Sequence, residues 1–413
     1  MPAPFPRPLL QRARRLPCRA VAGFTLVELM VAMTGGLFLT IVVFALSRDA
    51  SRFYQRESRV ANATLAGLSG FERLSADVAR AGHLSTPNMQ TDPRVCNRPA
   101  TGTLPGDLRA LVVQSGVTDV AGTELPTAGI SPQTITVAGA LNAPEVLISS
   151  AIDNATGPWQ ITLNLNTPAA KRLGLEIGKN NAPVMTALFM AGGQGRIVRL
   201  RANGWDQYGV VSNVAGPLGG DAVVTLAAAP ALQRLVSGGE QCGIDNLGTG
   251  YAISIIDVVR YSIRSMVANT DYKALFDASF GSGGGPALPY EAKRAELVRD
   301  ELGVDGVTPI PGTREIVGEY AVDLQVNAWS ATDAINPALT PVADLTTYPS
   351  TQLLRGVHLR FSVRSREADR EGPIAGETGN DHYRIGLGAS GGAPYARVRT
   401  FQSDIPLRNL EGR

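Results

Sequence analysis

The clearest pattern in the chain is an apolar run near the N-terminus. Phe24 to Leu46 holds 23 residues with a single charge, that of Glu28. As a helix this run would reach ~34 Å, which is enough to cross a hydrocarbon core of about 30 Å. The pattern therefore predicts a membrane-spanning helix over residues 24–46.

The helical pattern continues through residues 47–82, where apolar side chains recur at three- and four-residue spacing. They are Phe53, Val60, Thr64, Leu68, Phe71, Leu74 and Val78. The charged residues between them are expected on the opposite, solvated face: Arg48, Asp49, Arg52, Arg56, Glu57, Arg59, Glu72, Arg73, Asp77 and Arg80. Gly82 stands where a capping glycine belongs. Because no proline interrupts residues 24–82, we predict one helix of roughly 59 residues, in which Gly35-Gly36 is either a packing surface of small residues or a point of bending.

The rest of the chain, the head, carries strand-like runs bounded by Gly, Pro, Asn and Asp, which is typical of an antiparallel β domain. The short runs are 109–114, 134–138, 145–149, 160–165, 196–201 and 222–227, and the long ones are 251–267, 315–329, 356–366 and 395–407. A glycine-rich loop at 281–289 precedes residues 290–302, which we interpret as a short charged helix. We thus predict an α+β protein with a first β-rich part at 83–270, an insertion at 271–312 and a second β-rich part at 313–413.

Composition adds little until the charge is divided along the chain. The 413 residues have a formal net charge of +2, which argues against a protein that binds nucleic acid by neutralising phosphates. Residues 1–23, however, contain five arginines and no acidic residue. A basic flank before an apolar span orients the N-terminus toward the cytoplasm, with the head outside the inner membrane.

Three hypotheses compete for this N-terminal segment. A secretory signal peptide would be cut after a shorter apolar region; Ala45-Leu46-Ser47 could serve, but the span is long and contains an acid, and Ala20-Val21-Ala22 precedes the span. A plain signal anchor fits the length and gives Glu28 no role. The third hypothesis is that residues 1–23 are a cytoplasmic leader.

The third hypothesis rests on Gly23-Phe24-Thr25-Leu26-Val27-Glu28, which resembles the prepilin processing motif of type IV pilins and type II secretion pseudopilins. The resemblance implies that a prepilin peptidase cuts after Gly23 and that the new N-terminal residue, Phe24, is N-methylated. An acid in a membrane helix is costly and usually paired. Glu28 could pair with the Phe24 α-amine of a neighbouring subunit and fix its register, or with the amine of its own chain.

Within this class the chain resembles the PilW type of minor pilin, with pseudopilin J as a relative. The stretches that carry the resemblance are 71–83, 258–264, 322–326, 363–366 and 405–409. The resemblance implies a pilin-like fold, in which a long helix packs on a large β-rich head. It also implies as partners the major pilin, other minor pilins and, for a tip position, a PilY-type adhesin. Residues 97–250 have no counterpart in it.

The cysteines add one structural hypothesis. Cys18 lies in the leader, which leaves Cys96 and Cys242 in an exported head. In an oxidising compartment this pair favours a disulfide, worth about 3–5 kcal/mol in the chain-entropy model. Two buried free thiols are the alternative.

Signals for an enzyme are poor. No zinc, redox or nucleotide motif occurs, and Gly388-Ala389-Ser390-Gly391-Gly392, although it matches G-x-S-x-G, has no histidine after the serine. His382 beside Asp381 is interpreted as a surface pair. We therefore expect no catalytic residue, metal or cofactor, and a structural subunit of a type IV pilus; the alternatives are a J-type pseudopilin and, from another class, a membrane-anchored periplasmic binding or hydrolytic module.

Overall fold

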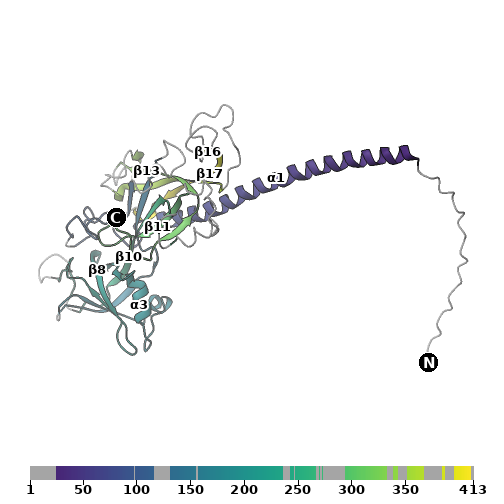
Figure 1. Cartoon of the computed structure of the whole chain (residues 1–413). Coiled ribbons are helices and arrows are strands. Elements are labelled where there is room, and N and C mark those ends of the chain that lie inside the picture. The colour runs from purple at the N-terminus through teal and green to yellow at the C-terminus, as the bar shows by residue number, and fades with distance from the viewer. Residues whose placement is uncertain are drawn as a thin grey trace, which may run out of the picture. The chain divides into compact units, whose positions relative to one another are not determined.

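The computed structural model describes residues 25–96, 98–115, 131–154, 157–235, 242–245, 247–266, 269, 272, 294–332, 338–342, 351–366, 384–386 and 395–410. The chain divides into two compact units, Met1–Glu57 and Ser58–Arg413, which we describe separately (Figure 1). The first unit contains most of an apolar helix, and the second contains the end of that helix and the β-rich head.

The long N-terminal helix is present as one element. Helix α1 spans Leu26–Ala79 and passes through Gly35 and Gly36 without a break. It ends three residues before Gly82, which adopts a left-handed φ of 70° and donates its N–H to the carbonyl of Ala138 at 2.9 Å. The prediction of one helix is confirmed, with slightly shorter bounds than 24–82.

The division of faces along α1 differs from the prediction in two places. Phe53, assigned to the buried stripe, is 65% exposed. Asp77, assigned to the solvated face, is 1% exposed. Both errors have the same cause: periodicity shows which residues share a face, but it does not show which turns of the helix are covered by a tertiary partner.

Six antiparallel strands of the head close into a small barrel, in the order β10-β3-β4-β9-β8-β7 and back to β10. The closure is visible at Ala252 of β10, which lies opposite Ile148 of β3 on one side and Arg201 of β7 on the other. The strands are β3 (Leu147–Asp153), β4 (Gln160–Leu163), β7 (Ile197–Ala202), β8 (Trp205–Ala215), β9 (Val223–Leu226) and β10 (Ala252–Arg264). Closure removes the open sheet edges that these strands would otherwise present.

The barrel interior is apolar, and short elements cover it. Its cluster includes Ile161, Val198, Leu200, Val224, Ile253 and Ile255, all at most 1% exposed. Helices α2 (Pro168–Arg172) and α3 (Ala182–Phe189) supply Ala170, Met185 and Phe189, and a two-stranded ribbon of β5 (Met190–Ala191) and β6 (Gln194–Gly195) follows α3. The barrel therefore accounts for most of the region 97–250.

Strand β10 continues beyond the barrel and becomes the centre of an open sheet. Its second half pairs with β2 (Thr134–Gly139) on one side and β11 (Glu296–Glu301) on the other. The outer neighbours are β1 (Leu111–Gln114) and β12 (Glu315–Gly318). One continuous strand thus joins the barrel to the rest of the head.

A second antiparallel sheet has the order β14-β13-β15-β17-β16. Its strands are β13 (Ala321–Ala331), β14 (Leu339–Val342), β15 (Leu354–Arg364), β16 (Arg384–Gly386) and β17 (Tyr395–Pro406), with short 3-10 turns at Thr351–Leu353 and Arg408–Leu410. The largest apolar cluster of the described residues combines this sheet, the open sheet around β10 and the end of α1. A long helix and a large antiparallel β head, an α+β fold, are therefore confirmed.

The predicted strand runs are found as strands, except that 315–329 divides into β12 and β13, which belong to different sheets. The short charged helix at 290–302 is wrong where the structure describes it. Residues 296–301 form strand β11, whose six side chains are all buried. Each of its four charged residues has an oppositely charged partner: Arg294 for Glu296, Asp77 for Arg299, Arg314 for Asp300 and Arg196 for Glu301. Tertiary partners make a buried charged strand possible, and the sequence does not reveal them.

Candidate functional site

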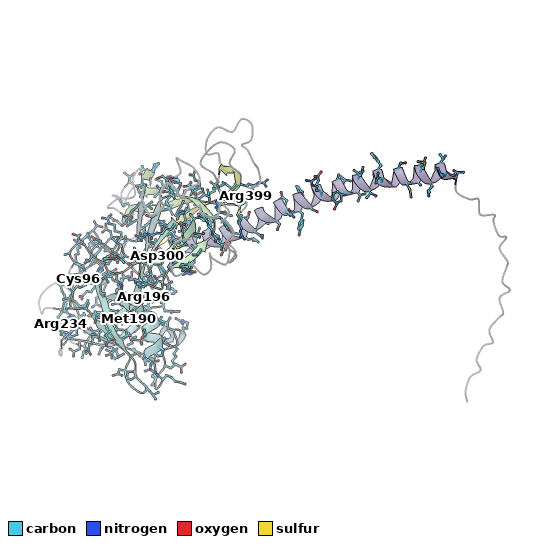
Figure 2. The ribbon with its side chains drawn as sticks, in the orientation of Figure 1. Cys96, Met190, Arg196, Arg234, Asp300 and Arg399 are labelled. Atoms are coloured by element: carbon cyan, nitrogen blue, oxygen red, sulfur yellow. A yellow bond between two sulfur atoms is a disulfide. The ribbon has the colours of Figure 1, made fainter. Side chains whose placement is uncertain are left out.

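The first candidate site is the apolar surface of α1 in the first unit. Its large apolar side chains from Leu26 to Leu46 are between 39% and 74% exposed, and they point outward around the helix (Figure 2). The segment Leu26–Gln55 is long and apolar enough to span a membrane, with a mean hydropathy of 2.4 in its most apolar window. This agrees with an N-terminal membrane anchor, and the orientation of that anchor stays a prediction.

Glu28 and Thr25 begin this helix with a reciprocal capping arrangement. The N–H and hydroxyl of Thr25 each donate to Oε2 of Glu28 at 3.0 Å, and the Glu28 N–H donates to Oγ1 of Thr25 at 3.2 Å. This is the capping box of a helix N-terminus. The structure therefore gives Glu28 a local role, whereas Gly23 and Phe24 lie outside the described residues.

Two small residues let the end of α1 lie close to the head. A Cβ at Gly67 would stand 2.6 Å from the ring of Phe401 and 2.7 Å from Val363, and one at Gly70 would stand 2.5 Å from the carbonyl oxygen of Val317. Directly after Gly70, Phe71 stacks on Phe401 with ring centroids 6.0 Å apart. Any larger residue at 67 or 70 would force the helix away from both sheets.

A buried charge then fixes the position of the helix. Asp77 accepts from the hydroxyl of Tyr261 on β10 at 2.6 Å and from Nε of Arg299 on β11 at 2.9 Å. Burial and the carboxylate of Asp77 raise the pKa of Tyr261, so the phenol stays protonated and donates. We call Gly67, Gly70, Phe71, Asp77, Tyr261 and Arg299 the helix clamp.

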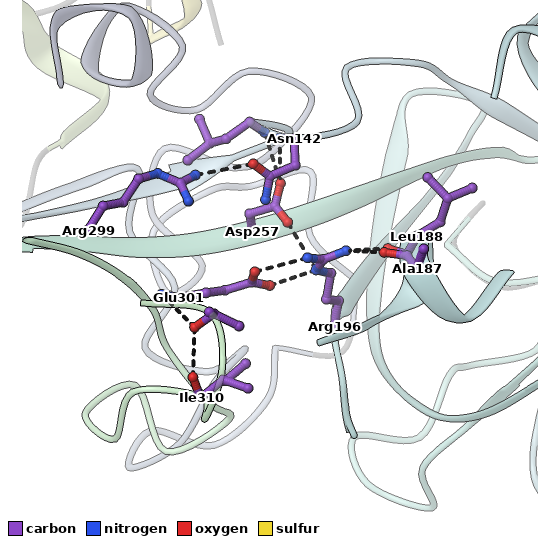
Figure 3. A network of polar contacts seen from close by, with 10 residues as sticks. Asn142, Ala187, Leu188, Arg196, Asp257, Arg299, Glu301 and Ile310 are labelled. Atoms are coloured by element: carbon purple, nitrogen blue, oxygen red, sulfur yellow. Dashed lines mark hydrogen bonds and ion pairs between the residues drawn. The ribbon is translucent and has the colours of Figure 1, made fainter. Parts of the chain in front are cut away.

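Arg299 connects the clamp to a second network at the middle of β10 (Figure 3). Its NH2 group donates to Oδ1 of Asn142 at 3.2 Å, and the backbone N–H of Asn142 donates to Asp257 at 2.8 Å. Asp257 lies 3.2 Å from Nε of Arg196, which also forms two hydrogen bonds with Glu301, of 2.6 and 2.9 Å. The network thus reaches from the end of α1 to Arg196, which directly precedes barrel strand β7.

In this second network, burial and the neighbouring charges act differently on the pKa of Asp257 and on that of Arg196. Burial raises the pKa of Asp257, and the attraction of Arg196 offsets only part of this effect. Burial also opposes the charge of Arg196, but its bonds to Glu301 and the nearby Asp257 raise its pKa overall. Arg196 also donates to the carbonyls of Ala187 and Leu188 at the end of α3, where a cation is favourable.

The two cysteines of the head form a disulfide, as predicted. Cys96 and Cys242 are bonded, with Cα atoms 5.8 Å apart. The N–H of Cys96 also donates to the carbonyl of Asp206, the second residue of barrel strand β8, at 2.9 Å. The bridge therefore ties the segment that follows α1 to the barrel.

Candidate catalytic groups are few. Within the described ranges, no three His, Cys, Asp or Glu side chains converge as a metal ion would require. The G-x-S-x-G run around Ser390 and the pair Asp381-His382 lie outside those ranges. The described residues offer two kinds of candidate site, the exposed apolar surface of α1 and the surfaces of the head.

In comparisons with protein-family models, with curated proteins and with solved structures, nothing matches this chain significantly. The family resemblance of the N-terminal motif thus remains a hypothesis. Sequence reasoning missed the clamp and the Arg196 network. One signal was available, since Asp257 is the single acid inside the apolar run 252–259 of β10.

Proposed function

We propose that the chain is a structural subunit without enzymatic activity, a minor pilin of the PilW type that takes part in type IV pilus assembly. In this proposal a prepilin peptidase removes residues 1–23, Phe24 is methylated, and α1 holds the protein in the inner membrane with its head in the periplasm. Extraction then moves the subunit from the membrane into the fibre outside the cell.

The observation that carries the proposal is that the two parts of α1 have different surroundings. Its first part is exposed and apolar, which suits first a lipid bilayer and then the apolar helices of other subunits. Its last part is locked into the head by the helix clamp. A subunit pulled out of a membrane by its head needs this connection, because the force has to reach the helix.

The size of the head supports a position at the fibre tip. The barrel adds a second closed core to the head, and such a bulky head packs poorly in a repeating helical array. The partners would then be other minor pilins, the major pilin and a PilY-type adhesin. Regular spacing of this subunit along the shaft in electron micrographs would contradict the tip position.

Mass spectrometry of the mature N-terminus tests the proposal. We expect a chain that begins with methylated Phe24 in cells that contain prepilin peptidase. A Gly23→Ala variant of the same chain is the matched control and should keep its leader. An intact leader in the unmodified chain, or cutting after Ser47, would reject the proposal.

The two roles of Glu28 can be separated by a pair of variants. Glu28→Gln keeps an acceptor for the Thr25 N–H, because glutamine also serves at this position of a capping box, but it removes the charge. Glu28→Ala removes both. If Glu28 pairs with the α-amine of a neighbour, both variants should be lost from sheared fibres; if it only caps α1, Glu28→Gln should enter fibres like the unmodified chain.

The alternative within the same class is a J-type pseudopilin. Deletion of the gene separates the two: loss of surface pili with normal protein secretion supports the pilus, and the reverse supports the secretion system. The alternative of a periplasmic binding or hydrolytic module predicts that the leader is not removed at Gly23, so the mass measurement tests it as well.

A further inference from the structure

The outer face of the sheet β14-β13-β15-β17 contains a groove of about 600 Å³. A volume of this size lies within the range of small-molecule sites. The inner face of the same sheet contributes Leu324, Val357 and Phe361 to the core around α1. The groove is therefore on the face that the head does not use for its own packing.

The groove exists because a glycine lies in the middle of a row of residues across four strands. Pro341, Trp329, Gly356 and Pro406 are direct neighbours across β14, β13, β15 and β17. Gly356 has no side chain to fill the space between the indole of Trp329 and the ring of Pro406. The result is a hollow with the indole of Trp329 along one side.

Polar side chains stand in the next row on the same face. His358 and Asp404 are direct neighbours on β15 and β17, and Nδ1 of His358 lies 2.8 Å from Oδ1 of Asp404. The imidazole packs edge-on near Trp329, with ring centroids 6.3 Å apart. The side chain of Asp404 is 79% exposed, so its carboxylate can accept further hydrogen bonds at the rim.

These features limit what the groove can bind. In the row of Trp329 and Gly356, β13 and β15 each pair with a strand on both sides, so an extended peptide could not add as a strand between them. The groove offers the indole of Trp329, apolar side chains and two charged groups at its edge. Its apolar lining includes Leu339, Pro341 and Pro406, and the charged groups are Arg355 and Asp404, the second of which is bonded to His358.

We infer that this groove is a carbohydrate-binding site for a pyranose sugar. A pyranose has an apolar face of C–H groups, which can stack on the indole of Trp329, and hydroxyls around its edge, which can donate to Asp404. The absent side chain at Gly356 gives the ring its space. This inference does not depend on the pilus hypothesis, because the site belongs to the head alone.

The test uses the full chain in a zwitterionic detergent without a sugar headgroup. Methyl glycosides of glucose, galactose, mannose and N-acetylglucosamine, together with lactose and cellobiose, are titrated and followed by calorimetry. We expect saturable binding of at least one of these sugars. Trp329→Ala should weaken it about tenfold or more, because it removes the ring on which the sugar stacks; tenfold corresponds to about 1.4 kcal/mol.

Two further variants keep the test independent of folding. Gly356→Ala leaves Trp329 in place and puts a methyl group into the hollow; the new Cβ would lie 3.3 Å from the carbonyl oxygen of Ile405, the one atom within 4 Å of it. It should weaken binding while circular dichroism stays unchanged. Gln402→Ala is the matched control: Gln402 is exposed on β17 but does not line the groove, so this variant should bind like the unmodified chain.

Three results would overturn the inference. The first is no saturable binding of any sugar in the panel. The second is sugar binding that both Trp329→Ala and Gly356→Ala leave unchanged. The third is Trp329-dependent binding of a proline-rich peptide probe without binding of any sugar, which would make the groove a protein contact.

Discussion

In the barrel, six strands close on one another through backbone hydrogen bonds, and the side chains inside are apolar. Around α1, two sheets enclose a helix that comes from outside both of them, and the interior includes Asp77, Arg299 and the hydroxyl of Tyr261. The core side chains of both regions are buried, but the barrel interior is apolar, whereas the interior around α1 also contains charged and polar groups. The barrel is complete by itself, whereas the second core needs α1 to fill it.

The difference shows that a helix packed between two sheets needs a specific contact to fix its axial position, whereas a closed barrel does not. A closed sheet sets its own register through its hydrogen bonds. A helix that lies between two sheets could slide along its axis while keeping apolar contact. A buried ion pair with one allowed partner removes that freedom, and breaking it is costly. We interpret Asp77 as the residue that fixes how far α1 enters the head.

The largest effect is expected from Asp77→Ala. It leaves Arg299 buried without its counter-ion, at a cost of about 3–5 kcal/mol. Hydrogen exchange of the full chain in detergent should show lost protection in the end of α1 and in β11, with the barrel strands unchanged. Glu72→Ala, an exposed change on the same helix, is the control. Equal loss in the barrel would show that the two cores are one cooperative unit.

Removal of the disulfide should act mainly on the barrel side. Reduction, or Cys96→Ser with Cys242→Ser, should lower the free energy of unfolding by about 2–5 kcal/mol. Protection should fall first in peptides around 92–96 and the start of β8, because the backbone hydrogen bonds that join these two segments lie next to bridged Cys96. Unchanged urea midpoints in the reduced and oxidised chain would contradict this expectation.

A matched pair of truncations compares the two apolar interiors directly. Ile161→Val in the barrel and Ile263→Val near α1 remove the same methylene from residues that are 0% and 1% exposed. Each should cost about 0.5–1.5 kcal/mol in urea unfolding. If the cores open independently, each variant should change hydrogen exchange only in its own region; changes in both regions would count against independence.

The smallest expected effect is on the pH dependence of stability, through Asp257 on β10. Because burial raises the pKa of Asp257 in the folded head, its contribution to stability is present in acid and is lost as pH rises through that raised pKa. Asp257→Asn has no such loss. Relative to this variant, the unmodified chain should therefore become less stable as pH rises above about 4, the ordinary pKa of an aspartate. A difference in unfolding free energy that is constant with pH would contradict this.

Much of the fold could be predicted from local pattern. The apolar run and its helical continuation gave one long helix, and strand-like runs bounded by turn residues matched β1–β4, β7, β9 and the long strands of the head. These features depend on propensity and periodicity along a few neighbouring residues. Strand β8 was missed, although it forms part of the barrel wall.

The errors share a different cause. Residues 296–301 were interpreted as part of a helix and Asp77 was placed on the solvated face, because charged residues usually stay in water. Their counter-ions come from positions far away in the sequence: Asp77 and Arg299 are 222 residues apart, and Arg196 and Glu301 are 105 apart. No local pattern contains that information.

The sequence by itself determined the apolar span, the continuity of α1 and most of the strands, and it favoured the pairing of Cys96 with Cys242, since each follows from local composition or from simple counting. Only the tertiary structure decided where α1 meets the head, that β10 belongs to both a barrel and an open sheet, and that Gly356 leaves a groove beside Trp329. These features depend on which distant residues become neighbours. Once they are neighbours, a charged residue such as Asp77 can be buried beside its counter-ion, and a glycine such as Gly356 can leave a hollow between larger side chains.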